Sequence, residues 1–254
     1  MTTRRQWRIA SIGVVRVLEI WRYPVKSLQG ERVDVVEAGG QGLAGDRRWA
    51  LFDTGTGFGL TARRHPELLF ASARLVDDEQ VTITLPDGST AEDDAALSRW
   101  LERPVELRDA SWDGERRYEN PADFENERDG AWSPFEGGHG AFHDGEGLTV
   151  SLLSTASIGT WDRRRFRANL LVEGAGEDDL VGHEVGVGDA VLAVAERIPR
   201  CVTTTRPQPD GIGRDLDVLR TLHRVRGGLL AVGASVRQPG RVAVGDLVGL
   251  ATAG

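Results

Sequence analysis

Residues 183–198 read HEVGVGDAVLAVAERI, and residues 240–250 read GRVAVGDLVGL. Both stretches place apolar residues at alternate positions around the same Val-Gly-Asp tripeptide, and a period of two is typical of β-strands. Glycine followed by aspartate favours a turn, so we interpret each stretch as a separate pair of short strands. Repeated short strands without long intervening helices favour a closed or nearly closed β-barrel.

Further strands are predicted within residues 14–22, 31–53, 81–85, 148–153 and 165–174. Residues 91–107 (AEDDAALSRWLERPVEL) predict a helix that Pro104 stops, and residues 214–226 (RDLDVLRTLHRVR) predict an amphipathic one. The fold class is therefore mainly β with a few helices (α+β). We divide the chain into an N-terminal β domain, residues 12–108, and a β-barrel domain, residues 109–254, with a cleft between them.

Composition indicates a folded, turn-rich protein, because 40% of its 254 residues are hydrophobic and it contains 32 glycines and 10 prolines. This length suits one large domain or two ordinary ones, and we prefer two. The start, MTTRRQWRIASIG, has no long apolar segment, and no run approaches the ~20 apolar residues of a membrane span. A single cysteine excludes an internal disulfide framework. We expect a cytoplasmic protein without a membrane partner.

The formal net charge of −8 comes from an acidic segment, residues 109–147, which has eleven Asp and Glu against three Arg. The segment has no sustained period but is rich in aromatic residues, so we expect an ordered, loop-rich connection. It is either a flap over a site or an insertion packed on the surface. A pI near 5.2 and the lack of a continuous basic stripe argue against nucleic acid as a partner.

Lysine and cysteine are each used once in this chain. Lys26 stands among thirty arginines, which indicates a need for a compact ammonium group; chance survival on a loop is the alternative. Cys201 follows Arg200, whose charge favours the thiolate; a buried structural cysteine is the alternative. The five histidines form no zinc signature, and we expect the His139–His143 pair to face solvent.

Four polar residues lie near predicted strand ends. Ser154 or Thr155 is a natural N-cap for a short helix, and an anion could also bind there. Arg167 and Asn169 lie two positions apart in FRANL, so a strand would place both side chains on one face. That face either binds a ligand or is simply exposed.

Five motifs occur in a defined order: YPVKS (23–27), GDRRWAL (45–51), TAR (61–63) before Pro66, FRANL (166–170) and PRCVTTT (199–205). Together they resemble the MOSC family in its two-part form with an N-terminal β domain. Bacterial homologues of the mitochondrial amidoxime-reducing component are the most similar in pattern. The resemblance runs from about Val14 to Leu250. One departure is Ala168, where the family commonly has proline.

This resemblance implies a molybdenum cofactor bound in the cleft, with Cys201 as both metal ligand and catalytic residue. It also implies a superfamily link to pyridoxal phosphate binding. Arg47 matches the family's cofactor-binding arginine, and its neighbour Arg48 is easily confused with it. The implied cofactor-binding residues are Lys26, Ser27, Arg47, Ser154, Thr155, Arg167, Asn169, Pro199, Arg200 and Cys201.

The activity implied by the resemblance is reduction of N-oxygenated, N-hydroxylated small molecules. The chain has no cysteine-rich ferredoxin segment, so electrons must come from a separate cytochrome b5-, ferredoxin- or flavin-type partner. Two alternatives stay open: a non-catalytic carrier of the molybdenum cofactor, and a persulfide sulfur-transfer protein that uses Cys201.

Overall fold

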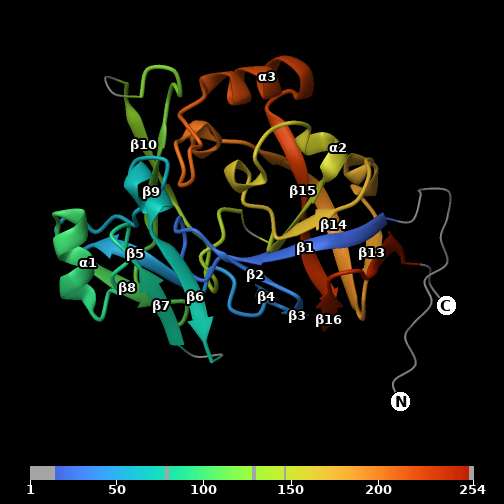
Figure 1. Ribbon diagram of the computed structural model, residues 1–254, viewed down its shortest axis with the longest axis horizontal. Coiled ribbons are helices and arrows are strands. Elements are labelled where there is room, and N and C mark those ends of the chain that lie inside the picture. The colour runs from blue at the N-terminus through green and yellow to red at the C-terminus, as the bar shows by residue number, and fades with distance from the viewer. Residues whose placement is uncertain (1–14, 78–79, 128–129, 146, 252–254) are drawn as a thin grey trace.

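The computed structural model describes residues 15–77, 80–127, 130–145 and 147–251. Over these residues the regular secondary structure is mainly β-strand, with three α-helices and four short 3-10 helices (Figure 1). The fold class expected from the sequence is confirmed. No described helix has both the length and the hydropathy needed to cross a membrane.

The strands of the barrel sheet are β1 (Val15–Arg22), β2 (Glu31–Val33), β11 (Val150–Ser154), β12 (Leu170–Val172), β13 (Glu184–Val187), β14 (Ala190–Pro199), β15 (Leu229–Gln238) and β17 (Leu247–Leu250). Their order is β12-β11-β15-β14-β13-β17-β1-β2. Because β12 also pairs with β1, seven strands close into a barrel and β2 is appended at its side. Valine, leucine and isoleucine from alternate positions fill its interior.

The first Val-Gly-Asp stretch forms the predicted hairpin. β13 and β14 pair antiparallel, with Val185 opposite Leu192 and Val187 opposite Ala190. Gly188 turns the chain at a φ of +58°, and a Cβ there would lie 2.3 Å from Asp246 Oδ2. Glycine is therefore required at this turn by both the backbone conformation and the close approach.

The second Val-Gly-Asp stretch is not a hairpin, and that prediction was wrong. β16 (Gly240–Ala243) pairs with β3 (Val35–Gly39), whereas β17 pairs with β1 and β13. The Val17 N–H donates to the Asp246 carbonyl oxygen at 2.9 Å, and the Gly245 N–H donates to the Val17 carbonyl oxygen at 2.8 Å. This turn therefore bonds to β1, and its two strands diverge into different sheets.

The first half of the chain forms small sheets beside the barrel. They contain β3 (Val35–Gly39) with β4 (Gly42–Leu43) and β16, β5 (Trp49–Asp53) with β8 (Val105–Asp109), and β6 (Ser72–Val76) with β7 (Gln80–Thr84). The β5–β8 and β6–β7 sheets share a second apolar cluster around Leu51, Leu68 and Leu97, whereas β3, β4 and β16 contribute to the apolar cluster of the barrel. Since β1 belongs to the barrel and β3 pairs with β16, strands of the first half also complete sheets of the second. The boundary between residues 108 and 109 stays a prediction.

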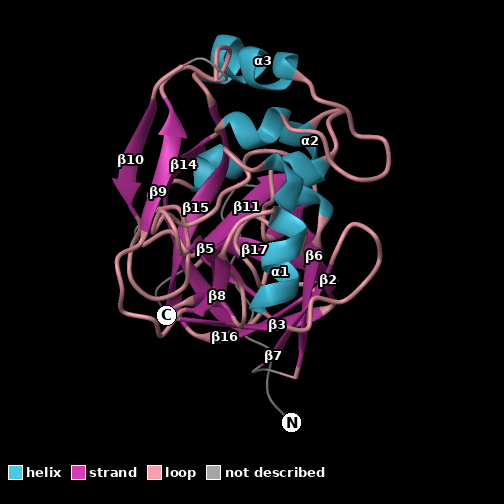
Figure 2. Ribbon diagram, turned by 90° about the vertical axis from the view of Figure 1, so that its left-hand side faces the viewer, coloured by secondary structure: helices cyan, strands magenta, loops and turns pink. Residues whose placement is uncertain are grey.

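The helices lie where their sequence signals place them. α1 (Asp94–Leu101) begins after Asp93, whose carboxylate accepts a hydrogen bond from the Ala96 N–H at 2.7 Å. α2 (Thr155–Ile158) follows β11, and α3 (Leu216–Arg226) precedes β15. Figure 2 shows α3 at one end of the molecule. The 3-10 helices are η1 (Pro66–Phe70), η2 (Arg163–Arg165), η3 (Glu177–Leu180) and η4 (Val202–Thr205).

The acidic segment is more regular than the loop-rich connection expected. Its residues form a hairpin of β9 (Arg117–Pro121) and β10 (Trp132–Glu136). Tyr118 and Phe142 from the segment are buried against Phe52 of β5. Ion pairs join Glu119 to Arg64 at 3.0 Å and Glu125 to Arg220 of α3 at 2.7 Å. The segment is thus fastened to both halves of the chain, and arginines of other elements neutralise much of its charge.

Candidate functional site

The loop that follows β14 carries the single cysteine. Pro199 ends β14, and Cys201 occupies the residue before η4. The Cys201 thiol is half-buried and lies 3.4 Å from Thr203 Oγ1. Burial opposes ionisation, but the positive charge of Arg63 and the hydrogen bonds with Thr203 outweigh it, so the pKa of the Cys201 thiol is lowered. The thiolate therefore forms more readily here than in an exposed, isolated cysteine.

Arg63 comes from the turn formed by residues 61–65, in which the Arg64 and His65 N–H groups donate to the Thr61 carbonyl oxygen. Its guanidinium lies beside Cys201 and forms an ion pair with Asp144 at 2.9 Å. Burial would lower the pKa of Arg63, but the charges of Asp144 and Cys201 raise it above its ordinary value. The TAR motif contains this arginine, but the motif alone did not indicate that Arg63 belongs to the site.

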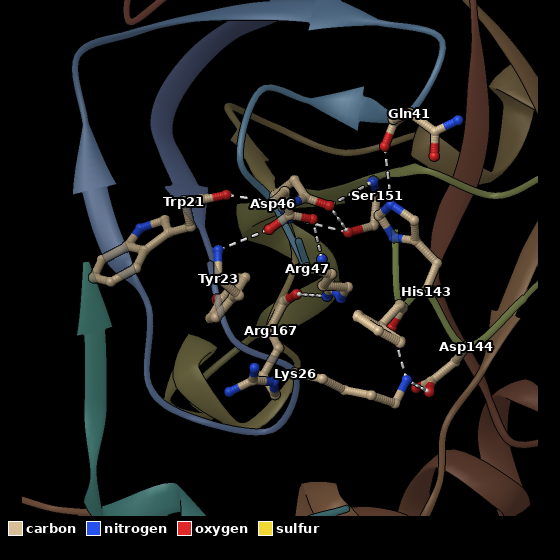
Figure 3. A network of polar contacts seen from close by, with 12 residues as sticks. Trp21, Tyr23, Lys26, Gln41, Asp46, Arg47, His143, Asp144, Ser151 and Arg167 are labelled. Atoms are coloured by element: carbon tan, nitrogen blue, oxygen red, sulfur yellow. Dashed lines mark hydrogen bonds and ion pairs between the residues drawn. The ribbon is translucent and has the colours of Figure 1, made fainter. Parts of the chain in front are cut away.

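Lys26 lies in the loop after β1 and is only 5% exposed. Its Nζ donates to the Phe142 carbonyl oxygen at 2.9 Å and pairs with the Asp144 carboxylate (Figure 3). It also lies 4.9 Å from the centre of the Tyr118 ring. Burial lowers the pKa of Lys26, and the charge of Asp144 opposes that shift. The single lysine is thus a buried point charge held at the end of the acidic segment.

Ser27 follows in a left-handed backbone conformation, with a φ of 71°. Its Oγ accepts a hydrogen bond from the Ala62 N–H at 3.0 Å. Since Ala62 precedes Arg63, this bond fastens the Lys26 loop to the turn that carries Arg63. The role of Ser27 that is visible here is to join two loops of the site.

Arg47 and Arg167 both lie over the Tyr23 ring, with their guanidinium carbons 5.3 Å and 4.3 Å from the ring centre. Arg47 pairs with Asp46 and donates to the Arg167 carbonyl oxygen at 3.4 Å (Figure 3). Burial lowers the pKa of Arg167 to about 10. Its Nη1 is buried and has no hydrogen-bond partner among the described residues, which leaves a donor free for a ligand.

Arg48, the neighbour most easily confused with Arg47, pairs elsewhere. Its Nε donates to Asp109 at 3.0 Å, and its guanidinium lies over the Trp49 ring. Its side chain is 36% exposed, compared with 17% for Arg47. Of the two arginines, Arg47 is therefore the one that joins Tyr23 and Arg167.

The expectation that Arg167 and Asn169 share a strand face was wrong. Arg167 has a left-handed φ of 52°, and β12 begins only at Leu170. A left-handed residue breaks the alternation of side chains that a strand would impose. The family's proline position, Ala168, lies inside this irregular stretch.

Asn169 is instead buried, with 1% of its surface exposed, and its side chain links strands β11 and β1. Its Oδ1 accepts hydrogen bonds from the N–H and Oγ of Ser151 at 3.1 Å and 3.0 Å. Its Nδ2 donates to the Trp21 carbonyl oxygen at 3.1 Å. The amide therefore already has protein partners on both its oxygen and its nitrogen.

Ser154 is the N-cap of α2, as predicted, and its Oγ accepts from the Ser157 N–H at 3.2 Å. Thr155 Oγ1 donates to the Gly174 carbonyl oxygen at 3.3 Å and accepts from the Gly174 N–H at 3.0 Å. Both hydroxyls thus bond to the protein itself. Their binding to a cofactor stays a prediction.

Arg200 extends from the residue before the cysteine. Its Nη2 donates to the Phe166 carbonyl oxygen, while its Nε is buried and has no hydrogen-bond partner among the described residues. Burial lowers the pKa of Arg200, and the charges of Cys201 and Asp144 oppose the shift. Arg200 therefore shares one electrostatic environment with the thiol.

Together these side chains form what we call the cationic cluster: Lys26, Arg47, Arg63, Arg167 and Arg200. The charge of Asp144 acts on all five of them. With Asp46 as the other carboxylate among them, the cluster keeps an excess of positive charge even when Cys201 is a thiolate. Such an excess suits an anionic ligand.

Asp144 and Arg63 are the site residues that sequence analysis missed. Asp144 is one of eleven acids in the acidic segment, and no local signal separates it from the others. His143, beside Asp144, was expected to face solvent, but the structure leaves it only partly exposed. Burial, followed by the charge of Arg47, lowers the pKa of its ring to about 4.

A cavity of about 230 Å³ lies next to the turn that carries Arg63. Its walls include Phe58, Arg64, His65, Arg103 and Glu119. None of the cofactor-binding residues expected from the sequence lines it. This cavity is therefore distinct from the surroundings of Cys201.

Comparison with known proteins identifies the family. Residues 14–127 match the MOSC N-terminal beta barrel domain, and residues 140–249 match the MOSC domain. The chain belongs to the MOSC family. This family is related to molybdenum-cofactor sulfurase and includes proteins that bind the molybdenum cofactor. No curated protein matches the chain.

Two solved structures are similar to this MOSC protein. The YuaD protein from Bacillus subtilis has 12% identity and a TM-score of 0.42, with 96% of this chain and 97% of that chain covered. YiiM from Geobacillus stearothermophilus has 16% identity and a TM-score of 0.35, with 54% of this chain and 72% of that chain covered.

The side chains present fit a molybdenum cofactor. A thiol whose pKa is lowered is a suitable soft ligand for the metal. The buried Arg167 Nη1, without a partner among the described residues, and the excess positive charge suit the negatively charged phosphate and dithiolene groups of the pterin.

Proposed function

We propose that this MOSC protein binds a molybdenum cofactor, with Cys201 on the metal, and reduces N-hydroxylated small molecules such as amidoximes. A cytoplasmic location and a separate electron donor are part of the proposal. The observation that carries it is the Cys201 thiol, whose pKa is lowered by Arg63 and Thr203 at the edge of the cationic cluster.

Each part of the cluster has a defined task in this proposal. Arg63 and Thr203 lower the pKa of Cys201 and so favour the thiolate, which is the form that bonds a metal. Arg167 offers the Nη1 donor that has no partner among the described residues, and Arg47 holds the Arg167 backbone. Lys26 supplies a buried ammonium charge from the first half of the chain. These residues orient the cofactor from both halves.

When bound, the molybdenum cofactor would supply the two-electron transfer that the side chains cannot perform. Reduction of an N-hydroxyl group to an amine consumes two electrons and two protons and releases water. Asp144 does not supply those protons at neutral pH, because the charges of Arg63 and Lys26 hold the pKa of its carboxyl far below the usual range. Its role is to hold Arg63 and Lys26.

The test starts with protein purified from cells that synthesise the cofactor. We expect about one molybdenum per chain by elemental analysis. We also expect reduction of benzamidoxime to benzamidine when reduced methyl viologen replaces the physiological donor. Protein that contains neither molybdenum nor pterin, even after incubation with isolated cofactor, would contradict the proposal.

The same preparation separates the two alternatives. Molybdenum and pterin without turnover would indicate a carrier. A sulfane sulfur on Cys201, released by cyanide from a metal-free preparation, would indicate persulfide transfer, which a thiol with a lowered pKa also suits.

A further inference from the structure

Glu127 is a buried carboxylate near the tip of the β9–β10 hairpin, with 7% of its side chain exposed. Its Oε1 accepts from Arg206 Nη1 at 2.6 Å and from Arg214 Nη2 at 2.9 Å. Burying a carboxylate is costly unless a cation compensates it, so this arrangement is specific rather than incidental.

Arg206 uses the other arm of its guanidinium for a different contact. Its Nη2 donates to the carbonyl oxygen of Arg63. The planar guanidinium can hold both partners at once, because its N–H groups point in fixed directions. Arg206 is itself only 8% exposed, so neither contact is a loose surface ion pair.

The backbone of Arg206 is fixed as firmly as its side chain. Its N–H donates to the Thr203 carbonyl oxygen at 3.1 Å, and its carbonyl oxygen accepts from Arg165 Nη1 at 3.2 Å. Thr203 is also the residue whose hydroxyl contacts Cys201. Arg206 therefore joins the cysteine loop, the acidic segment and the turn that carries Arg63.

We propose that Glu127 and Arg206 form a positioning pair that holds Arg63 beside Cys201. Glu127 orients the Arg206 guanidinium, and Arg206 fixes the backbone from which the Arg63 side chain extends. The inference deepens the proposed function, since it concerns the thiol that would bind the metal. The contact itself is a property of the chain and can be tested without cofactor.

Cys201 is the only thiol in the chain, so its alkylation can be followed without ambiguity. Iodoacetate carries a negative charge and iodoacetamide does not, while both react with the same thiolate. We divide the rate constant for iodoacetate by the rate constant for iodoacetamide. The thiolate fraction cancels in this ratio, which therefore rises with the positive potential beside the sulfur. The measurement is made on cofactor-free protein at low ionic strength, because salt screens the effect.

The Arg63→Met variant gives the alkylation ratio in the absence of the Arg63 guanidinium. We expect this ratio to be at least about threefold lower than that of the wild type. Glu127→Gln is expected to lower the ratio in the same direction. Removing a negative charge would by itself raise the ratio, so a fall reports that Arg63 has moved. An unchanged or raised ratio in Glu127→Gln would overturn the proposal.

The double variant Glu127→Gln/Arg206→Met leaves the net charge unchanged and leaves no unpaired Glu127 carboxylate, which protects the fold. We expect its ratio to approach that of Arg63→Met. Arg214→Met is the matched control, because it removes the more exposed partner of Glu127 without touching Arg63. We expect it to keep the ratio within about 1.5-fold of the wild type, and a fall as large as that of the double variant would also overturn the proposal.

The outcome for the positioning pair is separate from the outcome for the proposed function. If wild-type protein takes up no molybdenum cofactor, the alkylation ratios still decide whether Glu127 and Arg206 position Arg63. If the cofactor binds and the ratios do not change among the variants, the positioning pair fails while the proposed function stands.

Discussion

Lys26 Nζ lies 2.9 Å from the carbonyl oxygen of Phe142, across 116 positions of sequence. The bond joins the loop after the first barrel strand to the end of the acidic segment. An ammonium group fits this buried place, where its hydrogen atoms point to the carbonyl and to the Asp144 carboxylate. A guanidinium is larger and planar, so we expect it to fit this space less well than the ammonium group does.

Lys26→Met should therefore weaken both folding and cofactor retention. The Phe142 carbonyl would lose a charged donor, so the free energy of unfolding should fall by about 1 to 3 kcal/mol. Lys26→Arg should also lower retention, measured as pterin content per chain after gel filtration. Arg48→Met, which removes a cation from the more exposed pair with Asp109, is the control. Full retention of the pterin in Lys26→Arg would indicate that a lysine occurs at this position by chance.

Arg167 and Asn169, although two positions apart, should respond to mutation in opposite ways. Arg167→Met removes a guanidinium whose Nη1 has no partner among the described residues, so cofactor affinity should fall with little change in urea unfolding. Asn169→Ala leaves the Trp21 carbonyl and the Ser151 groups without their amide partner. We expect it to cost about 1 to 3 kcal/mol in the free energy of unfolding of the cofactor-free protein.

The reverse pattern, with Asn169→Ala stable but unable to retain cofactor, would show that the asparagine contacts the cofactor directly. Ser151→Ala is a useful companion, because it removes one partner of Asn169 from β11. It should destabilise less than Asn169→Ala, since the Ser151 N–H keeps its bond to Asn169 Oδ1.

The barrel could be predicted from the sequence because the alternation of apolar residues and the turn residues that indicate its strands are local features. Alternation around Gly188 predicts a hairpin, and the structure confirms it. The same reasoning failed around Gly245, where an identical tripeptide bonds to β1 and its flanking strands separate. Turn chemistry is the same in both places, and only tertiary pairing distinguishes them.

Motifs indicated the loops of the site but not the arrangement of every side chain. A resemblance could point to Lys26 and Cys201, whereas Asp144 is visible only when the chain folds and brings it to two cations. The left-handed conformation of Arg167 has no sequence signature, because such a residue is usually glycine or asparagine. Non-local contacts and unusual backbone conformations thus account for what the sequence did not predict.

Cys201→Ser should keep the fold and lose the metal–thiolate link. Serine is close to cysteine in volume, but its hydroxyl is far less acidic and its oxygen is a harder ligand. We expect the sulfur-to-molybdenum absorption to disappear and benzamidoxime reduction to stop, with the thermal unfolding midpoint of the cofactor-free protein nearly unchanged. Unaltered absorption and turnover in this variant would remove Cys201 from the metal.

His143 predicts how stability depends on pH. Its pKa is lowered to about 4 by burial and by the charge of Arg47, and its Nε2 lies 3.1 Å from the Gln41 carbonyl oxygen. In an unfolded chain a histidine has a pKa of about 6.5. Below that pH the unfolded chain binds a proton that the folded chain does not, so stability is lost as the pH falls from about 6.5 to about 4.

The size of this loss follows from the gap between the two pKa values. On the order of 3 kcal/mol should disappear from the free energy of unfolding between pH 7 and pH 4 through this residue. In His143→Gln that contribution is absent, so its stability should fall less steeply than that of the wild type in urea titrations at pH 7, 5.5 and 4. His139→Gln, at an exposed position of the same loop, should follow the wild-type curve. Parallel curves for His143→Gln and the wild type would mean that the ring accepts a proton as easily in the folded chain as in water.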